Sequence, residues 1–117
     1  MTRIIWLCLA LVSVQQAVSQ EIVTSRKLVI AGGGSLPGAV YEKFVELAGE
    51  QSSLVVIPTA SSLEPDEKSL IKIWKQRGFE SVQILHTRDR KVAKDTAFAK
   101  PIDDATAVWL GGGSQSK

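Results

Sequence analysis

The stretch LVVIPTASS, residues 54–62, combines a continuous apolar run with an abrupt stop. Leu54 to Ile57 contain no polar residue, and Pro58 ends the run because proline cannot donate a backbone hydrogen bond to a neighbouring strand. Uninterrupted apolar runs of this length are typical of strands covered on both faces, as in a parallel sheet. The stretch therefore predicts a strand inside an α/β protein.

Three further short runs, at residues 28–31, 82–86 and 107–110, have a similar apolar character. We expect a strand at each of them, in addition to the one at 54–57. Helical patterns between the runs then give strand–helix–strand units, which form an open parallel sheet with right-handed crossovers. The sequence thus predicts a three-layer α/β fold. The sheet should be incomplete at the C-terminus of this chain, since no helical pattern follows residue 110.

Helical patterns fill the intervals between these runs. Apolar residues recur at helical spacing over 40–48. The pattern at 65–78 has acidic residues in its first turn and basic residues in its last, which complements the helix dipole. A weaker pattern covers 92–98. Trp74 and Trp109 each lie within an apolar stripe, so we expect both in the core rather than on a ligand-stacking surface.

The first nineteen residues have the organisation of a secretory signal peptide. Arg3 supplies a positive start, residues 4–14 form an apolar core, and Ala17 and Ser19 place small residues at the cleavage positions before Gln20. The apolar core is shorter than the roughly 20 residues that span a membrane. We therefore expect 1–19 to be removed on export to the periplasm or the outside. The mature domain would be 20–117, with no membrane attachment.

The composition excludes several classes of function. A net charge of +2, mixed along the chain, is too small for a nucleic-acid surface. The single cysteine, Cys8, lies in the signal-like segment, so the mature chain has no disulfide, thiolate metal site or cysteine nucleophile. The closest acidic pair, Asp103 and Asp104, is more typical of a helix end than of a metal site. We expect no cofactor, no metal and no nucleic-acid partner, and the sequence does not predict an oligomeric state.

Two glycine triplets, at 32–34 and 111–113, each follow an apolar run. Open parallel sheets bind ligands at the carboxyl ends of their strands, so we expect both triplets to meet at one crevice. A dinucleotide fingerprint fails because Pro37 occupies the third glycine position, and a phosphate-binding loop fails because Ala39 and Val40 replace its Lys and Ser/Thr. Two interpretations remain, a backbone N–H site for a substrate oxyanion or simple tight turns.

Polar residues at the expected strand ends could also carry chemistry. His86, the single histidine, could act as a base only with a hydroxyl in hydrogen-bond reach and an orienting acid. We expect a packing or rim role for it instead. Without a base, the hydroxyl residues at strand ends should serve turns or helix caps; they are Ser35, Thr59, Ser61 and Ser62.

Four segments, in this order and spacing, resemble one family: KLVIAGGGS (27–35), LVVIPTAS (54–61), RGFESVQILHTRDRKVAKD (77–95) and IDDATAVWLGGGSQ (102–115). They are similar to the N-terminal half of cyanophycinase-like serine peptidases, relatives of aspartyl dipeptidase with the class I glutamine-amidotransferase-like fold. The resemblance implies a serine peptidase that hydrolyses aspartyl-linked peptide bonds. Its full-length relative would bind a peptide or cyanophycin-like substrate and need no cofactor.

The resemblance also implies roles for the second glycine triplet. In the family the last strand is followed by Gly-Gly-Asp/Asn-Gln, which Gly112, Gly113 and Gln115 match, while Ser114 stands where Asp or Asn is usual. The backbone N–H groups of Gly113 and Ser114 would then form the oxyanion hole. The remaining glycines and the glutamine would line the same crevice: Gly32, Gly33, Gly34, Gly112 and Gln115.

The catalytic residues of the family do not occur in this chain. Their serine lies in a G-x-S-x-G motif after the next strand, with the histidine and the acid further on, and no G-x-S-x-G is present. The sequence therefore predicts the N-terminal part of such a peptidase, inactive alone, whether through a truncated gene, a partial record or a degenerate paralogue. The alternative is a non-catalytic exported α/β module that holds a ligand over its glycine loops.

Overall fold

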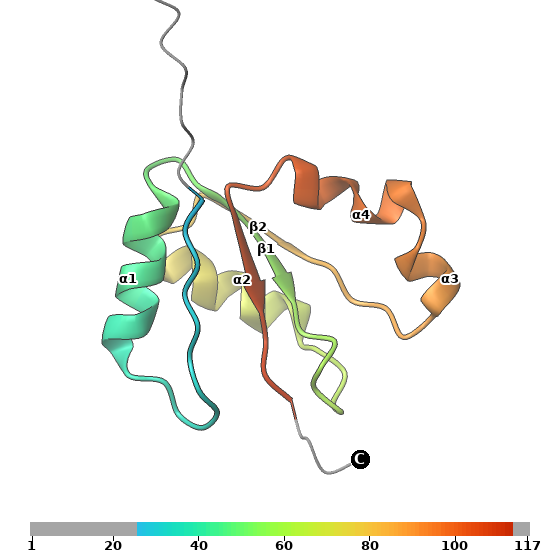
Figure 1. Cartoon of the computed structure of the whole chain (residues 1–117), viewed down its shortest axis with the longest axis horizontal. Coiled ribbons are helices and arrows are strands. Elements are labelled where there is room, and N and C mark those ends of the chain that lie inside the picture. Colours follow the sequence, from blue (N-terminus) through green and yellow to red (C-terminus); the bar gives the residue numbers. More distant parts are fainter. Residues whose placement is uncertain (1–25, 114–117) are drawn as a thin grey trace, which may run out of the picture.

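The computed structural model describes residues 26–113 (Figure 1). The predicted signal peptide, Ser114 and Gln115 lie outside this range. No helix within 26–113 has the length and apolar character needed to cross a membrane. The elements follow in the order α1 (Gly38–Ala48), β1 (Ser53–Ile57), α2 (Glu67–Gln76), β2 (Ser81–Ile84), α3 (Arg90–Ala93), α4 (Thr96–Asp103) and β3 (Ala107–Leu110).

The three strands form one parallel sheet in the order β2-β1-β3. β1 is the central strand, and its Leu54 pairs with Val82 on one side and Ala107 on the other. Figure 1 shows α1 and α2 on one side of the sheet and α3 and α4 on the other. An α/β fold with an open parallel sheet is therefore confirmed. The sheet is small and incomplete.

The predicted strand at 28–31 is wrong. These residues are extended but form no ladder with any described strand, and the side chains of Leu28 and Ile30 are 82% and 85% exposed. In Figure 1 the segment runs alongside β3, but a hollow separates the two. Without ladder hydrogen bonds an apolar run is not a strand, whatever its composition.

The main core lies between the sheet and the α1–α2 layer. Leu54, Val56 and Val82 of the strands pack there with Trp74 of α2, which is 4% exposed, and with Phe79. Trp109 of β3 is half-buried, and the centroids of its rings and those of Trp74 lie 4.8 Å apart. Both tryptophans are thus core residues as predicted. Tyr41 and Phe44 of α1 cover Trp109 from the outside, at 5.5 and 5.1 Å.

Local signals explain the helix bounds. α2 begins after Asp66, whose carboxylate accepts hydrogen bonds from the backbone N–H and the hydroxyl of Ser69. It ends before Gly78, which has a φ of 120° that a residue with a side chain would adopt only under strain. The weak pattern predicted at 92–98 is two short helices, because Asp95 ends the first stretch and caps α4 through the N–H of Ala97.

Candidate functional site

The loop after β3 packs directly against the loop after β1. The Gly111 N–H donates to the carbonyl of Ile57 over 3.1 Å, which continues the β1–β3 pairing past the end of the strand. Gly113 then lies against Ala60, so close that a Cβ on Gly113 would overlap the Ala60 carbonyl. Glycine is required at 113 for this contact. The two loops therefore meet at the carboxyl edge of the sheet, where open α/β proteins bind their ligands.

Both glycine triplets line one hollow of 690 Å³ between the 26–36 segment and β3. Gly32, Gly33 and Gly34 form part of one wall, and Gly112 and Gly113 form part of the other. Large apolar side chains complete the lining, among them those of Phe44 and Trp109. Ser114 and Gln115, the other two residues of the predicted crevice, lie outside the described range.

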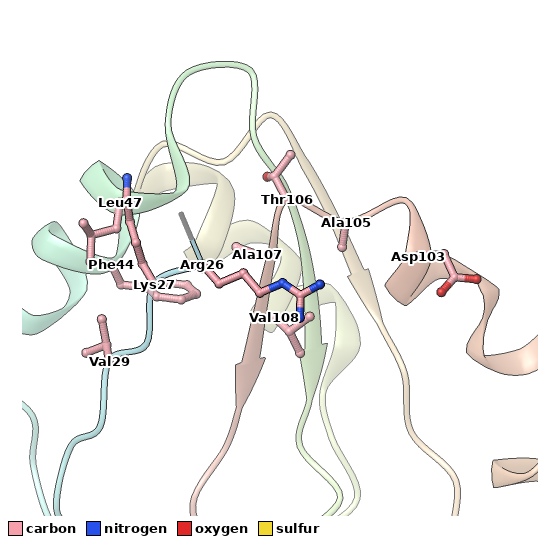
Figure 2. A pocket seen from close by; sticks show the side chains of 10 residues that line it. All are labelled: Arg26, Lys27, Val29, Phe44, Leu47, Asp103, Ala105, Thr106, Ala107 and Val108. Atoms are coloured by element: carbon pink, nitrogen blue, oxygen red, sulfur yellow. The ribbon is translucent and has the colours of Figure 1, made fainter. Parts of the chain in front are cut away.

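A second hollow, of 740 Å³, continues along β3 toward its N-terminal end (Figure 2). Val29, Phe44 and Val108 line both hollows. Figure 2 shows Val29 and Phe44 on one side and the β3 residues on the other, and Arg26 reaching across toward β3. The full lining is Arg26, Lys27, Val29, Phe44, Leu47, Asp103, Ala105, Thr106, Ala107 and Val108. The two hollows separate residues 28–31 from β3.

The chemistry available in the glycine hollow is that of backbone groups and apolar contacts. Every described residue in its lining is glycine or carries an apolar side chain. Glycine leaves backbone N–H groups accessible to a substrate, and such groups can stabilise an oxyanion. They cannot accept a proton, so these residues could bind and polarise a carbonyl but not activate a nucleophile.

A second polar feature lies at the ends of β1 and β2. The hydroxyl of Thr59 and Nδ1 of His86 are 3.2 Å apart, and Nε2 of the same imidazole lies 3.3 Å from Oε2 of Glu64. The side chain of His86 is only 10% exposed, while the carboxylate of Glu64 is largely in solvent. A hydroxyl, an imidazole and a carboxylate therefore lie next to one another in space, in that order, at the same edge of the sheet as the glycine loops.

Arg88 holds the carboxylate of this group in place. Its Nε donates to Oε1 of Glu64 over 3.0 Å, and its terminal nitrogen donates to the carbonyl of Ser61 over 3.1 Å. The hydrogen bond from Arg88 is the main reason why the pKa of Glu64 is held below its ordinary value, and partial desolvation opposes it. His86 lowers the same pKa further. Glu64 therefore faces the imidazole as an anion at neutral pH.

The expectation that Thr59 has no base beside it is wrong, since Nδ1 of His86 lies 3.2 Å from its hydroxyl, and the packing role expected for His86 stays a prediction. Each lies two residues beyond the end of its strand, and β1 and β2 are parallel neighbours in which Val56 pairs with Ile84. Counted from the Val56–Ile84 pair, Thr59 lies three residues on and His86 two, so both fall at the carboxyl ends of adjacent parallel strands. A polar residue just beyond each strand was the signal in the sequence. The turn role predicted for Ser61 is confirmed, since its hydroxyl accepts from the Leu63 N–H.

Within residues 26–113, no group of three or more His, Cys, Asp or Glu side chains is arranged to hold a metal ion. The polar group around His86 contains one imidazole and one carboxylate, and Arg88 occupies the other oxygen of that carboxylate. These are two candidate ligands, fewer than the three or four protein ligands of a typical zinc site.

The chain is similar to a known peptidase over part of its length. It is 24% identical over 78 residues to a protein described as cyanophycinase, from Geminocystis herdmanii (strain PCC 6308). The matched segment is 65% of this chain and 29% of that cyanophycinase, so the chain spans less than a third of the length of its curated relative. No family model matches the chain, and no solved structure matches it. The similarity supports a distant cyanophycinase-like relationship.

Proposed function

We propose that this chain is the N-terminal part of a cyanophycinase-like serine peptidase that hydrolyses aspartyl-linked peptide bonds. One observation carries the proposal: glycines of both triplets, Gly32 to Gly34 and Gly112 with Gly113, line a single hollow between the 26–36 segment and β3. The partial similarity to cyanophycinase supports the same relationship. The substrate would be a peptide or a cyanophycin-like polymer.

The loop after β3 is the proposed oxyanion site. Backbone N–H groups at Gly113 and Ser114 would bind the carbonyl oxygen of the scissile bond as it becomes negative. The tight contact of Gly113 with Ala60 supports this role, because it fixes the loop against β1 before the substrate arrives. Removal of one such donor costs about 100- to 1,000-fold in turnover in enzymes of this mechanism.

The serine, histidine and acid of the peptidase belong, in this proposal, to sequence beyond the matched segment. The lining of the glycine hollow agrees with this division of labour, since its described residues have no ionisable side chain. Residues 1–19 would direct export and be removed, so the mature peptidase would act outside the cytoplasm. It would use no cofactor and bind no nucleic acid.

Substrate binding by the purified chain tests the proposal. Backbone NMR should show shifts at 32–34 and 111–113 when cyanophycin or an aspartyl-linked dipeptide is added, and no product should form. Gly113→Ala should abolish the shifts, because its Cβ displaces the loop from Ala60. Gly38→Ala is the matched control, since its Cβ would meet only the Glu42 side chain at an ordinary 3.9 Å. Equal binding by both variants would contradict the proposed site.

A non-catalytic binding module is the second candidate. The observation that favours it is the same apolar and glycine lining, which can hold a ligand without reacting with it. The reading frame beyond Lys117 discriminates the two functions. A continuation that encodes a strand and G-x-S-x-G supports the peptidase, and a stop codon at that point supports the binding module.

A further inference from the structure

The hydroxyl–imidazole–carboxylate group at the ends of β1 and β2 is separate from the glycine hollow. Thr59, His86 and Glu64 line neither of the two hollows beside β3. They are held by their own contacts, at 3.2 Å between Thr59 Oγ1 and His86 Nδ1 and 3.3 Å between His86 Nε2 and Glu64 Oε2. This group needs a chemical explanation of its own.

The proton positions follow from the partners of the imidazole. An ionised carboxylate can only accept hydrogen bonds, so Nε2 of His86 carries the proton that faces Glu64. When the ring is neutral, Nδ1 has a lone pair that can accept a hydrogen bond from the Thr59 hydroxyl, which lies 3.2 Å away. This is the order of groups that activates a hydroxyl for nucleophilic attack, with the two ring nitrogens in exchanged roles.

The partner of Thr59 distinguishes it from the other hydroxyl groups described. The hydroxyls of Ser53 and Thr106 donate to backbone carbonyls, and that of Ser69 donates to a carboxylate. Those bonds satisfy local structure at a surface. Among residues 26–113, Thr59 is the hydroxyl residue for which the hydrogen-bond partner is a nitrogen base.

The carboxylate is also fixed rather than free to rotate. Arg88 donates to Glu64 and to the carbonyls of Ser61 and Leu63, so one guanidinium connects the acid to the loop that carries Thr59. A triad requires its acid to keep the imidazole in one tautomer and one orientation. Arg88 supplies that restraint as a positioning residue.

We propose that Thr59 is a nucleophile, activated by His86 and Glu64, that accepts acyl groups from activated aryl esters. The Thr59 oxygen bonds to the acyl carbon while its proton moves to Nδ1 of His86. The bond from the acyl carbon to the aryl oxygen breaks, and the phenol leaves with the proton from Nδ1. Water then attacks the acyl carbon of the Thr59 ester and passes a proton to Nδ1. The bond between the acyl carbon and the Thr59 oxygen breaks, Nδ1 returns the proton to that oxygen, and a carboxylic acid leaves.

The chemical class of the substrate follows from what the group contains. His86 is its single side-chain proton donor to a leaving group. A phenolate that is stable without protonation therefore suits it better than an amine leaving group. This activity is independent of the proposed peptidase, whose nucleophile lies elsewhere.

Acetylation by 4-nitrophenyl acetate is the test. The purified chain should release a burst of 4-nitrophenol, and peptide mapping should place one acetyl group on Thr59. Thr59→Val should abolish the burst and the acetyl adduct because it removes the nucleophile. His86→Asn should lower the burst rate about 100-fold, the lower range of general-base effects, while Thr59→Ser should keep the burst. Thr87→Val is the matched control. Thr87 is half-buried, follows His86 directly on the loop after β2, and its hydroxyl accepts a hydrogen bond from the Asp89 N–H.

The pH profile separates catalysis from a structural role. The burst should depend on pH in the wild type and in Thr59→Ser, because both need an imidazole that can take the hydroxyl proton, and Thr59→Val should show no burst at any pH. The charged groups that face the imidazole are Glu64 and, beyond it, Arg88. If His86→Asn fails to fold, the burst of Thr59→Val and the pH profile of the wild type still test whether Thr59 is the nucleophile. Acetylation confined to lysines, or an unchanged burst in Thr59→Val, would overturn the proposal.

Discussion

Two segments of almost the same composition behave in opposite ways. Leu54–Ile57 in β1 and 28–31 beside β3 are both four-residue apolar runs. Leu54 and Val56 are 1% and 2% exposed, whereas Leu28 and Ile30 are more than four-fifths exposed. The difference shows that the apolar residues of a segment set how much free energy its burial can contribute. Whether the segment is buried depends on the elements that pack beside it.

β1 has neighbours in every direction. It pairs with β2 and β3, and Trp74 and Phe79 cover one of its faces. The 28–31 segment borders the hollows beside β3 and pairs with no described strand. At about 25 cal/mol per Å² of apolar surface removed from water, only the first segment adds substantially to stability.

Removal of the Trp74 side chain, which covers one face of β1, should have the largest effect on stability. Trp74→Ala leaves a cavity beside Leu54 and Val56 and removes the ring contacts with Trp109. We expect the free energy of unfolding to fall by about 3–5 kcal/mol, as is usual for a buried Trp. Urea unfolding followed by circular dichroism measures it. A loss below about 1 kcal/mol would show that the α1–α2 layer does not hold β1 in place.

The two runs can be compared directly by matched truncations. Leu54→Ala should cost about 2–5 kcal/mol because the side chain is buried. Leu28→Ala should change stability by less than about 0.5 kcal/mol, since the leucine is 82% exposed. Both values come from the same urea titration. Similar losses for the two variants would mean that 28–31 is buried in solution.

The exposed run should bind hydrophobic dyes. Leu28, Ile30 and Leu110 present apolar side chains to solvent around the hollows, so the purified chain should enhance the fluorescence of a naphthalene sulfonate dye. Ile30→Thr should lower this fluorescence and leave the unfolding midpoint unchanged. A drop in the midpoint, or dye binding unaffected by the substitution, would count against an exposed segment.

The smallest expected effect is a pH dependence at the start of α2, the helix that carries Trp74. Hydrogen bonds from Ser69 hold the pKa of Asp66 below its ordinary value of 3.8. A carboxylate with a lowered pKa in the folded state stabilises the fold above that ordinary value, and the contribution is lost as pH falls through the lowered pKa. Stability in acid should therefore decline less in Asp66→Asn than in the wild type. Acid unfolding of the wild type and of Asp66→Asn, followed by circular dichroism, measures this difference. Coinciding curves for the two proteins would contradict a contribution from Asp66.

Much of the fold follows from the sequence because the relevant signals are local. Apolar runs mark β1, β2 and β3, and Asp66 and Gly78 mark the ends of α2 to within one or two residues. The same reasoning fails at 28–31, because pairing depends on which segment lies beside it. It also fails at Thr59 and His86, which are 27 residues apart and meet only because β1 and β2 are parallel neighbours.

The sequence by itself determined an α/β chain, its helix ends and the two glycine loops, because these depend on periodicity and on backbone conformations that few residues adopt. Only the tertiary structure decided which run became the central strand, and that a hydroxyl, an imidazole and a carboxylate lie next to one another. Those outcomes depend on strand order and register. Strand order and register are set by how the whole chain packs, and no short stretch of sequence contains them.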